Sequence, residues 1–167
     1  KTTLLACLAG EAEAQAGEIT RSRGAKVALV TQEVPARLMN LTFREVALDL
    51  LDDEARDSES WRAEIALDDL AVPQELRDRD IASLSGGWQR IALLARAAVS
   101  EPDVYLLDES TNHLDLSRIA HLTRWLAALP RETAVMLTAH DRAFLDEATT
   151  RTLFLRAEKS QAFALPY

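Results

Sequence analysis

Two adjacent carboxylates end a short apolar segment and could support metal-assisted chemistry. The run Val104–Leu107 is followed at once by Asp108 and Glu109. A buried strand brings such side chains to the carboxyl edge of a sheet, where α/β folds bind their ligands. There Asp108 can ligate Mg²⁺, and Glu109 can polarise an attacking water. The alternative is a pair of acidic residues that only caps a strand.

A second candidate site opens the sequence, where Lys1, Thr2 and Thr3 precede a helical pattern. The triplet matches the end of the phosphate-loop pattern G-x-x-x-x-G-K-[ST]. In that pattern the lysine ammonium reaches the β- and γ-phosphates, and the next hydroxyl ligates Mg²⁺. Taken alone, a Lys-Thr pair at the start of a helix is more often a solvated terminus.

Ser85, Gly86 and Gly87 stand directly before an amphipathic helical pattern and form a third candidate site. Ser85 is placed as the N-cap, and the glycines leave backbone N–H groups open at the positive end of the helix. Such a helix start binds anions. The alternative is a glycine turn before a capped helix.

The string LSGGWQR at residues 84–90 resembles LSGGQ, the signature of ATP-binding cassette (ABC) ATPases. Other family motifs occur in the expected order: KTT resembles the end of Walker A, VYLLDE resembles Walker B, and LTAHDR resembles the switch region. The resemblance implies that His140 contacts the γ-phosphate and the attacking water, and that Gln32 is the Q-loop residue near Mg²⁺. It also implies a D-loop at residues 110–115, with Ser110, Asn112 and Asp115 as its polar members.

The same resemblance implies a P-loop NTPase that binds ATP with Mg²⁺ and hydrolyses it as one of a head-to-tail pair of ABC domains. Hydrolysis is then an in-line attack on the γ-phosphorus, with Glu109 as the base. Ser85, Gly86 and Gly87 are expected to bind the nucleotide of the partner domain, across the interface. The residues expected to act on the nucleotide bound by this domain itself are Lys1, Thr2, Thr3, Gln32, Asp108, Glu109 and His140.

Short apolar runs alternate with longer stretches of helical spacing, which predicts an α/β fold with a mainly parallel sheet flanked by helices. Residues 42–80 show helical spacing without strand runs, so we expect an inserted helical lobe over residues 42–100 that carries the signature. The expected strands are Val27–Thr31, Val104–Leu107, Ala134–Thr138 and Thr152–Leu155, with a small edge strand at Gly17–Thr20. The expected helices are Thr2–Ala9, Ser85–Ser100 and Leu116–Leu129.

The composition fits one ABC-type ATPase domain over the 167 residues, of which 48% are hydrophobic and 28% charged. A net charge of −8 repels a phosphate backbone and argues against broad electrostatic binding of nucleic acid. Much of the acid lies between Asp49 and Glu64, which is typical of a solvated helical face. No run approaches the roughly 18 apolar residues of a membrane span, so we expect a cytoplasmic chain without direct membrane insertion.

Two strings favour one branch of the family. NHLD at residues 112–115 and HDRAFLD at residues 140–146 resemble the ABC-F proteins, soluble members with two ABC domains, several of which act on the ribosome. Ser110 stands at a position where the family usually has proline. Trp88, after the double glycine, resembles the signature of the first of the two ABC-F domains more than that of the second. A ribosome contact would run through segments outside this chain.

The sequence begins inside the phosphate-loop pattern, without the glycine loop or the strand that leads into it. We therefore expect these 167 residues alone to bind ATP weakly and to leave a slot in the sheet. Two alternatives to a soluble ABC-F-like ATPase remain open. One is the ATPase subunit of a membrane transporter, and the other is a remnant that does not hydrolyse ATP.

Overall fold

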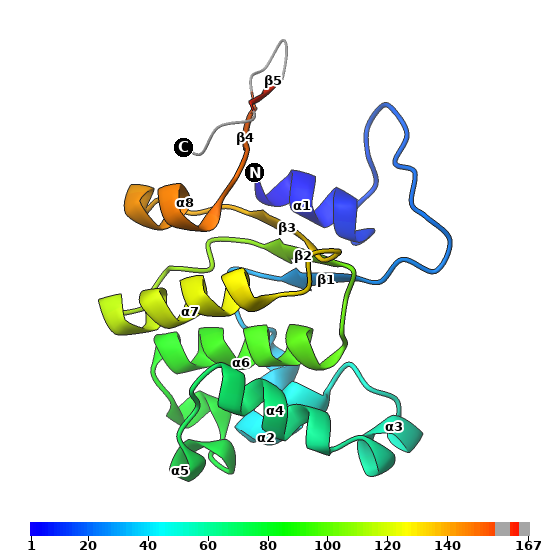
Figure 1. Cartoon of the computed structure of the whole chain (residues 1–167). Coiled ribbons are helices and arrows are strands. Elements are labelled where there is room, and N and C mark those ends of the chain that lie inside the picture. Colours follow the sequence, from blue (N-terminus) through cyan, green and yellow to red (C-terminus); the bar gives the residue numbers. More distant parts are fainter. Residues whose placement is uncertain (156–160, 164–167) are drawn as a thin grey trace.

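Three parallel strands in the order β1-β2-β3 form the sheet that carries the candidate site. They are β1 (Val27–Val30), β2 (Val104–Leu107) and β3 (Ala134–Leu137). In the register of the sheet, Leu107 lies between Val30 and Leu137. The residues that follow the three strands therefore leave the sheet at one edge. The computed structural model, drawn in Figure 1, describes residues 1–155 and 161–163.

The strands form where the sequence has short apolar runs, and this part of the prediction is confirmed. The central strand β2 is the most deeply covered, with Tyr105, Leu106 and Leu107 all buried. A strand covered on both faces needs apolar side chains at consecutive positions instead of an alternating pattern. β3 lies at one edge of the sheet, and its Val135 is 38% exposed.

Helices cover both faces of this sheet. Figure 1 shows α1 (Thr2–Ala9) on one face and both α6 (Gly86–Val99) and α7 (Leu116–Ala128) on the other. α1 ends as expected at Gly10, whose φ of 85° lies in the left-handed region that favours glycine. α7 and α8 (Arg142–Ala148) each begin after an aspartate whose side chain accepts a backbone N–H of the first turn.

The segment between β1 and α6 is helical, as its apolar spacing predicts. It contains η1 (Ala36–Leu38), α2 (Phe43–Leu48), α3 (Asp53–Ser58), α4 (Trp61–Asp69), α5 (Gln74–Arg77) and η2 (Ile81–Ser83). α2 and α4 pack against α6, which buries nine of its fourteen residues. At about 25 cal/mol per Å² of buried apolar surface, this helix is a main source of stability.

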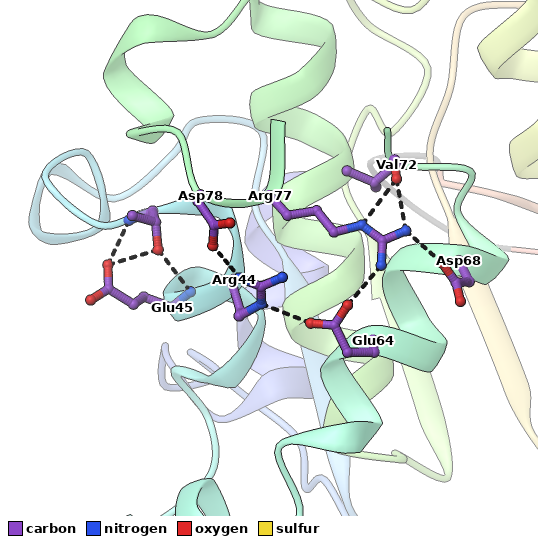
Figure 2. A network of polar contacts seen from close by, with 8 residues as sticks. Arg44, Glu45, Glu64, Asp68, Val72, Arg77 and Asp78 are labelled. Carbon is purple, nitrogen blue, oxygen red and sulfur yellow. Dashed lines mark hydrogen bonds and ion pairs between the residues drawn. The ribbon is translucent and has the colours of Figure 1, made fainter. Parts of the chain in front are cut away.

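A network around the buried Arg77 and the nearby Arg44 joins α5, α4 and α2, as Figure 2 shows. Arg77 in α5 is 3% exposed and donates to the Glu64 carboxylate of α4 at 2.8 Å and to the Val72 carbonyl at 2.8 Å. Arg44 of α2 donates to the other oxygen of Glu64 at 2.7 Å and also pairs with Asp78. Hydrogen bonding from Arg44, followed by that from Arg77, holds the pKa of Glu64 below its usual range despite burial.

A second ion cluster ties η1 and α2 to α6. Asp49, at the end of α2, accepts from Arg37 at 2.6 and 2.8 Å and from Arg96 of α6 at 2.7 Å. The hydrogen bonds from Arg37 are the largest influence on the Asp49 carboxyl, and its pKa is lowered although partial burial opposes this. The solvated helical face or loop expected between residues 49 and 64 is therefore correct for α3, which buries no residue, and wrong for Asp49, whose side chain is 10% exposed.

Two strand predictions differ from the structure. Gly17–Thr20 forms no strand, and Gly17 has a φ of 87° that an L residue rarely adopts. The segment expected at Thr152–Leu155 is a strand, β4 (Thr152–Phe154), but it pairs antiparallel with β5 (Gln161–Phe163) instead of joining the parallel sheet. Its Leu153 and Phe154 are 43% and 46% exposed, so an apolar run alone did not indicate burial.

None of the helices in the described part of the chain is long and apolar enough to cross a membrane.

Replacing Asp49 by Asn tests the second ion cluster. At pH 7 we expect the free energy of unfolding to fall by about 2–3 kcal/mol, because two arginines lose a charged acceptor. The folded pKa of Asp49 is depressed, so its stabilisation is present above the unfolded value of about 3.9 and is lost as pH falls through the folded value. Urea unfolding from pH 7 to pH 3 should show the gap between wild type and variant closing.

The matched control is Asp53→Asn, because the Asp53 side chain is fully exposed and its ion pair with Arg56 spans 3.6 Å. That change should alter stability by less than about 0.5 kcal/mol. An equal loss in both variants, or a gap that stays constant with pH, would contradict the role given to Asp49.

Candidate functional site

Asp108 and Glu109 lie at the carboxyl edge of the sheet, directly after β2, and both are buried. They are 2% and 9% exposed. Glu109 has a φ of 51°, a left-handed conformation that costs free energy for a residue with a Cβ. Backbone strain of this kind is concentrated at functional sites, because the surrounding structure must hold it in place.

Thr138, the residue after β3, organises the two carboxylates. Its hydroxyl donates to Oδ1 of Asp108 at 2.8 Å and accepts from the backbone N–H of Glu109 at 3.0 Å. Sequence reasoning did not select Thr138 as a site residue. The parallel pairing of β2 and β3 could have indicated Thr138. Leu107 lies opposite Leu137 in the register, so residue 138 lies beside residue 108.

His140 lies against Glu109, as the sequence prediction requires. The imidazole Nε2 is 3.2 Å from Oε1 of Glu109, and the His140 side chain is 78% exposed while that of Glu109 is 11% exposed. The histidine therefore contacts the carboxylate from the solvent side. A group in this place can orient Glu109 and also reach a ligand that approaches from outside.

Each of the two carboxylates has a free oxygen, and that of Asp108 fits a Mg²⁺ site. Within the described residues, Oδ2 of Asp108 and Oε2 of Glu109 are buried and have no hydrogen-bond partner. Buried carboxylate oxygens are costly to leave unpaired, so their position suits a ligand. Mg²⁺ is typically held by one or two carboxylates while water and phosphate supply its other oxygens. The described residues contain no cluster of three or more metal-binding side chains.

Gln32 reaches the same edge of the sheet from β1. Its side chain is exposed, while its backbone carbonyl and that of Thr31 both accept from the guanidinium of Arg90 in α6. Arg90 is 3% exposed. Burial is the largest influence on its pKa, which is lowered, and the charges of Asp108 and Glu109 oppose this. Sequence reasoning missed Arg90, although it is a charged residue one position before Ile91 of the apolar stripe of α6.

Lys1, Thr2 and Thr3 stand exposed at the start of α1. Lys1 occupies the N-cap position, and its carbonyl accepts from Leu4 and Leu5. Within the part of the chain that the structure describes, no hydrogen bond or ion pair joins these three side chains to Asp108 or Glu109. The structure thus brings together Asp108, Glu109 and His140, and it does not bring the first three residues into contact with them.

Ser85, Gly86 and Gly87 begin α6, as the sequence predicts. Ser85 takes the N-cap position, but its exposed hydroxyl accepts no N–H of the first turn. The first N–H groups of α6 therefore lack the side-chain acceptor that an N-cap serine usually gives them. A hydroxyl and a positive helix end that are both available to solvent suit an anion.

The D-loop string packs against this helix start. A Cβ on the buried Gly87 would lie 2.8 Å from the backbone carbonyl oxygen of His113, so glycine permits the close approach. Arg118 stacks on the Trp88 ring at 4.3 Å and pairs with Asp115 at 2.6 Å. Asp115 also caps α7.

The other two polar D-loop residues lie just after Glu109. Ser110 is fully buried, and its hydroxyl has no partner among the described residues. The backbone N–H of Asn112 donates to the carbonyl of Glu109 at 3.1 Å. Residues 85–88 and 113–118 therefore form one packed unit that continues to the buried carboxylates.

The family profile described as ABC transporter matches residues 1–112, which is more than half of the chain. The chain belongs to the ABC transporter family. This explains why KTT, LSGGWQR and VYLLDE share one chain in this order. The prediction from the signature string is confirmed, and the chain is an ABC ATPase domain with the P-loop NTPase fold.

Relatives and solved structures agree with this family. The ATP-binding protein Uup of Caulobacter vibrioides is 40% identical over 160 residues, covering 95% of this chain and 24% of that protein. A putative metal-chelate type ABC transporter superposes with a TM-score of 0.77 at 26% identity, covering 97% of this chain and 67% of that one. An archaeal ribosome recycling factor, solved with a ribosomal stalk protein, gives 0.75 at 25% identity, covering 97% and 31%.

The chain spans about a quarter of the length of the Uup protein. Within the family this ABC domain most resembles the ABC-F proteins, as the NHLD and HDRAFLD strings indicate. The matches to transporter and ribosome-associated structures show that the fold is shared by ABC domains with different partners. The fold therefore does not identify the partner of this chain.

Replacing Thr138 by Val tests the hydroxyl that joins the two carboxylates. The variant keeps the shape of the side chain but leaves Oδ1 of Asp108 and the N–H of Glu109 without this partner. We expect the free energy of unfolding to fall by about 2 kcal/mol, measured by urea titration. Thr138→Ser retains the hydroxyl and should cost less than about 1 kcal/mol. Equal losses would show that the methyl group matters instead of the hydrogen bonds.

Replacing Gly87 by Ala tests the contact between the signature and the D-loop. The new Cβ must displace the His113 carbonyl, and we expect a loss of about 2 kcal/mol in the free energy of unfolding. Gly86→Ala is the control, because its Cβ would meet only the His113 side chain at 3.4 Å or more. Alanine favours a helix over glycine by about 0.5–1 kcal/mol, so Gly86→Ala should be neutral or stabilising. A destabilised Gly86→Ala beside a stable Gly87→Ala would contradict the packing described.

Proposed function

We propose that this chain binds Mg-ATP and hydrolyses its γ-phosphate as one member of a head-to-tail pair of ABC domains. The observation that carries the proposal is the pair of buried carboxylates after β2. Each has one free buried oxygen, and Glu109 is contacted by His140 from the solvent side. This arrangement combines a cation ligand, a base and an orienting imidazole at one edge of a sheet.

In this proposal the residues have separate tasks at the nucleotide held in cis. Glu109 is the base that takes a proton from the attacking water, and His140 orients Glu109 and contacts the γ-phosphate. Asp108 holds the cation, with Thr2 and Gln32 as further candidates for its shell. Mg²⁺, when bound, offsets the negative charge of the phosphates. Lys1 and Thr3 also bind the ATP, and the lysine ammonium offsets the charge of the β- and γ-phosphates.

The start of α6 serves the nucleotide held by the partner domain. The exposed Ser85 hydroxyl and the N–H groups at Gly86 and Gly87 suit a phosphate that arrives from outside the chain. The D-loop unit lies beside this helix start, so Ser110, Asn112 and Asp115 belong to the same proposed interface. ATP then stabilises the closed pair, and hydrolysis releases it.

For the wider role, we propose a cytoplasmic ABC-F-like protein in which residues 42–100 act as a helical lobe. The NHLD and HDRAFLD strings support this branch, and the likeness to a ribosome recycling factor supports the ribosome as a partner, through segments outside this chain. The alternative is the ATPase subunit of a membrane transporter. The likeness to a metal-chelate type ABC transporter favours that alternative.

Replacing Glu109 by Gln in the gene product that contains this chain tests hydrolysis directly. We expect ATP turnover to fall at least about 100-fold, because the base is lost while the shape of the side chain is kept. ATP-bound pairs should accumulate and elute as a larger species in size-exclusion chromatography with Mg-ATP. Turnover is measured by phosphate release.

Glu147→Gln on the exposed face of α8 is the matched control and should leave both turnover and pairing unchanged. Equal turnover in Glu109→Gln and wild type would indicate a remnant that does not hydrolyse ATP. The trapped pairs also separate the two branches. Sedimentation with ribosomes supports the ABC-F-like role, and association with a membrane-spanning subunit contradicts it.

A further inference from the structure

α6 behaves as a rigid element that begins at the signature. Its fourteen residues run from Gly86 to Val99, and nine of them are buried. The turn that leads into the signature is fixed to this helix, because the Gln89 amide donates to the carbonyls of Ile81 and Leu84 at 3.1 Å each. The place of Ser85 is therefore set by the place of α6.

Arg90, in the second turn of α6, grips the backbone at Gln32. Its two terminal nitrogens donate to the consecutive carbonyls of Thr31 and Gln32, where the chain leaves β1. The guanidinium is buried, and within the described residues it forms no ion pair with a carboxylate. Arginine has a flat fork of donors that can satisfy two acceptors at once, whereas the ammonium of lysine is a single point.

The far end of the same segment is tied to α6 as well. Arg37 in η1 donates to Asp49, and Asp49 also accepts from Arg96 near the end of α6. The segment from Thr31 to Leu38 is thus joined to one helix at two places. These contacts couple the segment to α6 as well as to β1, which it follows directly in the chain.

We propose that Arg90 is a positioning residue that fixes the backbone at Gln32 to the signature helix. It sets the place of Gln32 at one nucleotide and of Ser85 at the other through a single rigid element. This inference rests on the proposed function, because it assigns a task to Gln32 at the nucleotide. Arg90 itself touches neither the nucleotide nor the attacking water.

Arg90→Met and Arg90→Lys, made in the gene product that contains this chain, test this inference. The amide of Asp108 donates to the Val30 carbonyl at 2.9 Å, directly before the two carbonyls that Arg90 holds. Hydrogen exchange at this amide should be at least about tenfold faster in Arg90→Met, because the end of β1 loses its anchor. The kcat for Mg-ATP should fall about 10- to 100-fold, with KM within about threefold of wild type, since Gln32 is misplaced for the chemical step. Arg90→Lys can reach only one carbonyl and should recover part of the kcat.

Arg124→Met is the matched control, because Arg124 is exposed on α7 and donates within its own helix. It should match wild type in exchange, kcat and KM. Wild-type exchange at the Asp108 amide in Arg90→Met overturns the anchor. A kcat of Arg90→Met equal to that of Arg124→Met overturns the role in catalysis.

A merely structural role has its own signature. If both Arg90 variants lose kcat only in proportion to the loss of folded protein in thermal melts, the inference is overturned. A failure of the proposed function is distinguishable, because the wild-type protein itself would then release no phosphate. In that case the exchange measurement alone decides whether Arg90 anchors the segment.

Discussion

Two carboxylates buried side by side are the constraint that organises this domain. Removing a carboxylate from water costs several kcal/mol unless charges and hydrogen bonds replace the lost hydration. Here the Thr138 hydroxyl supplies one hydrogen bond to Asp108, and the burial that lowers the pKa of Arg90 is opposed by the charges of both acids. One oxygen of each carboxylate is left free. A cation bound beside these free oxygens can offset the cost of leaving them without a partner.

Packing and ion pairs elsewhere in the chain stabilise the fold and offset the cost of this site. α6 packs against α2, α4 and β1 and supplies much of the apolar core. The ion clusters around Asp49 and Arg77 hold the surrounding helices, and both are partly shielded from water, so they are stronger than pairs on the open surface. By contrast, the features that cost free energy, which are the buried carboxylates and the strained backbone, are concentrated within a few residues after β2, where they can bind a ligand.

The sequence predicted the parallel strands, the long helices and the grouping of Asp108, Glu109 and His140, because each depends on a local pattern or on a distinctive string. It did not predict Thr138 or Arg90 as site residues. Their roles depend on the register between strands and on the packing of α6 over β1, which are contacts between residues 29 to 59 positions apart. The strand β4 was predicted but its partner was not, because pairing is not encoded in a single apolar run.

The loop between β2 and α7 links the signature to the carboxylates mechanically. It contains two non-glycine residues in the left-handed region, Glu109 with a φ of 51° and His113 with a φ of 66°. Its far end is held in place where the carbonyl of His113 packs on Gly87, and the Asp115 cap then starts α7. A short loop with strain at both ends and fixed neighbours has few ways to relax. The packing of His113 on Gly87 therefore joins the start of α6 to the loop that begins at Glu109.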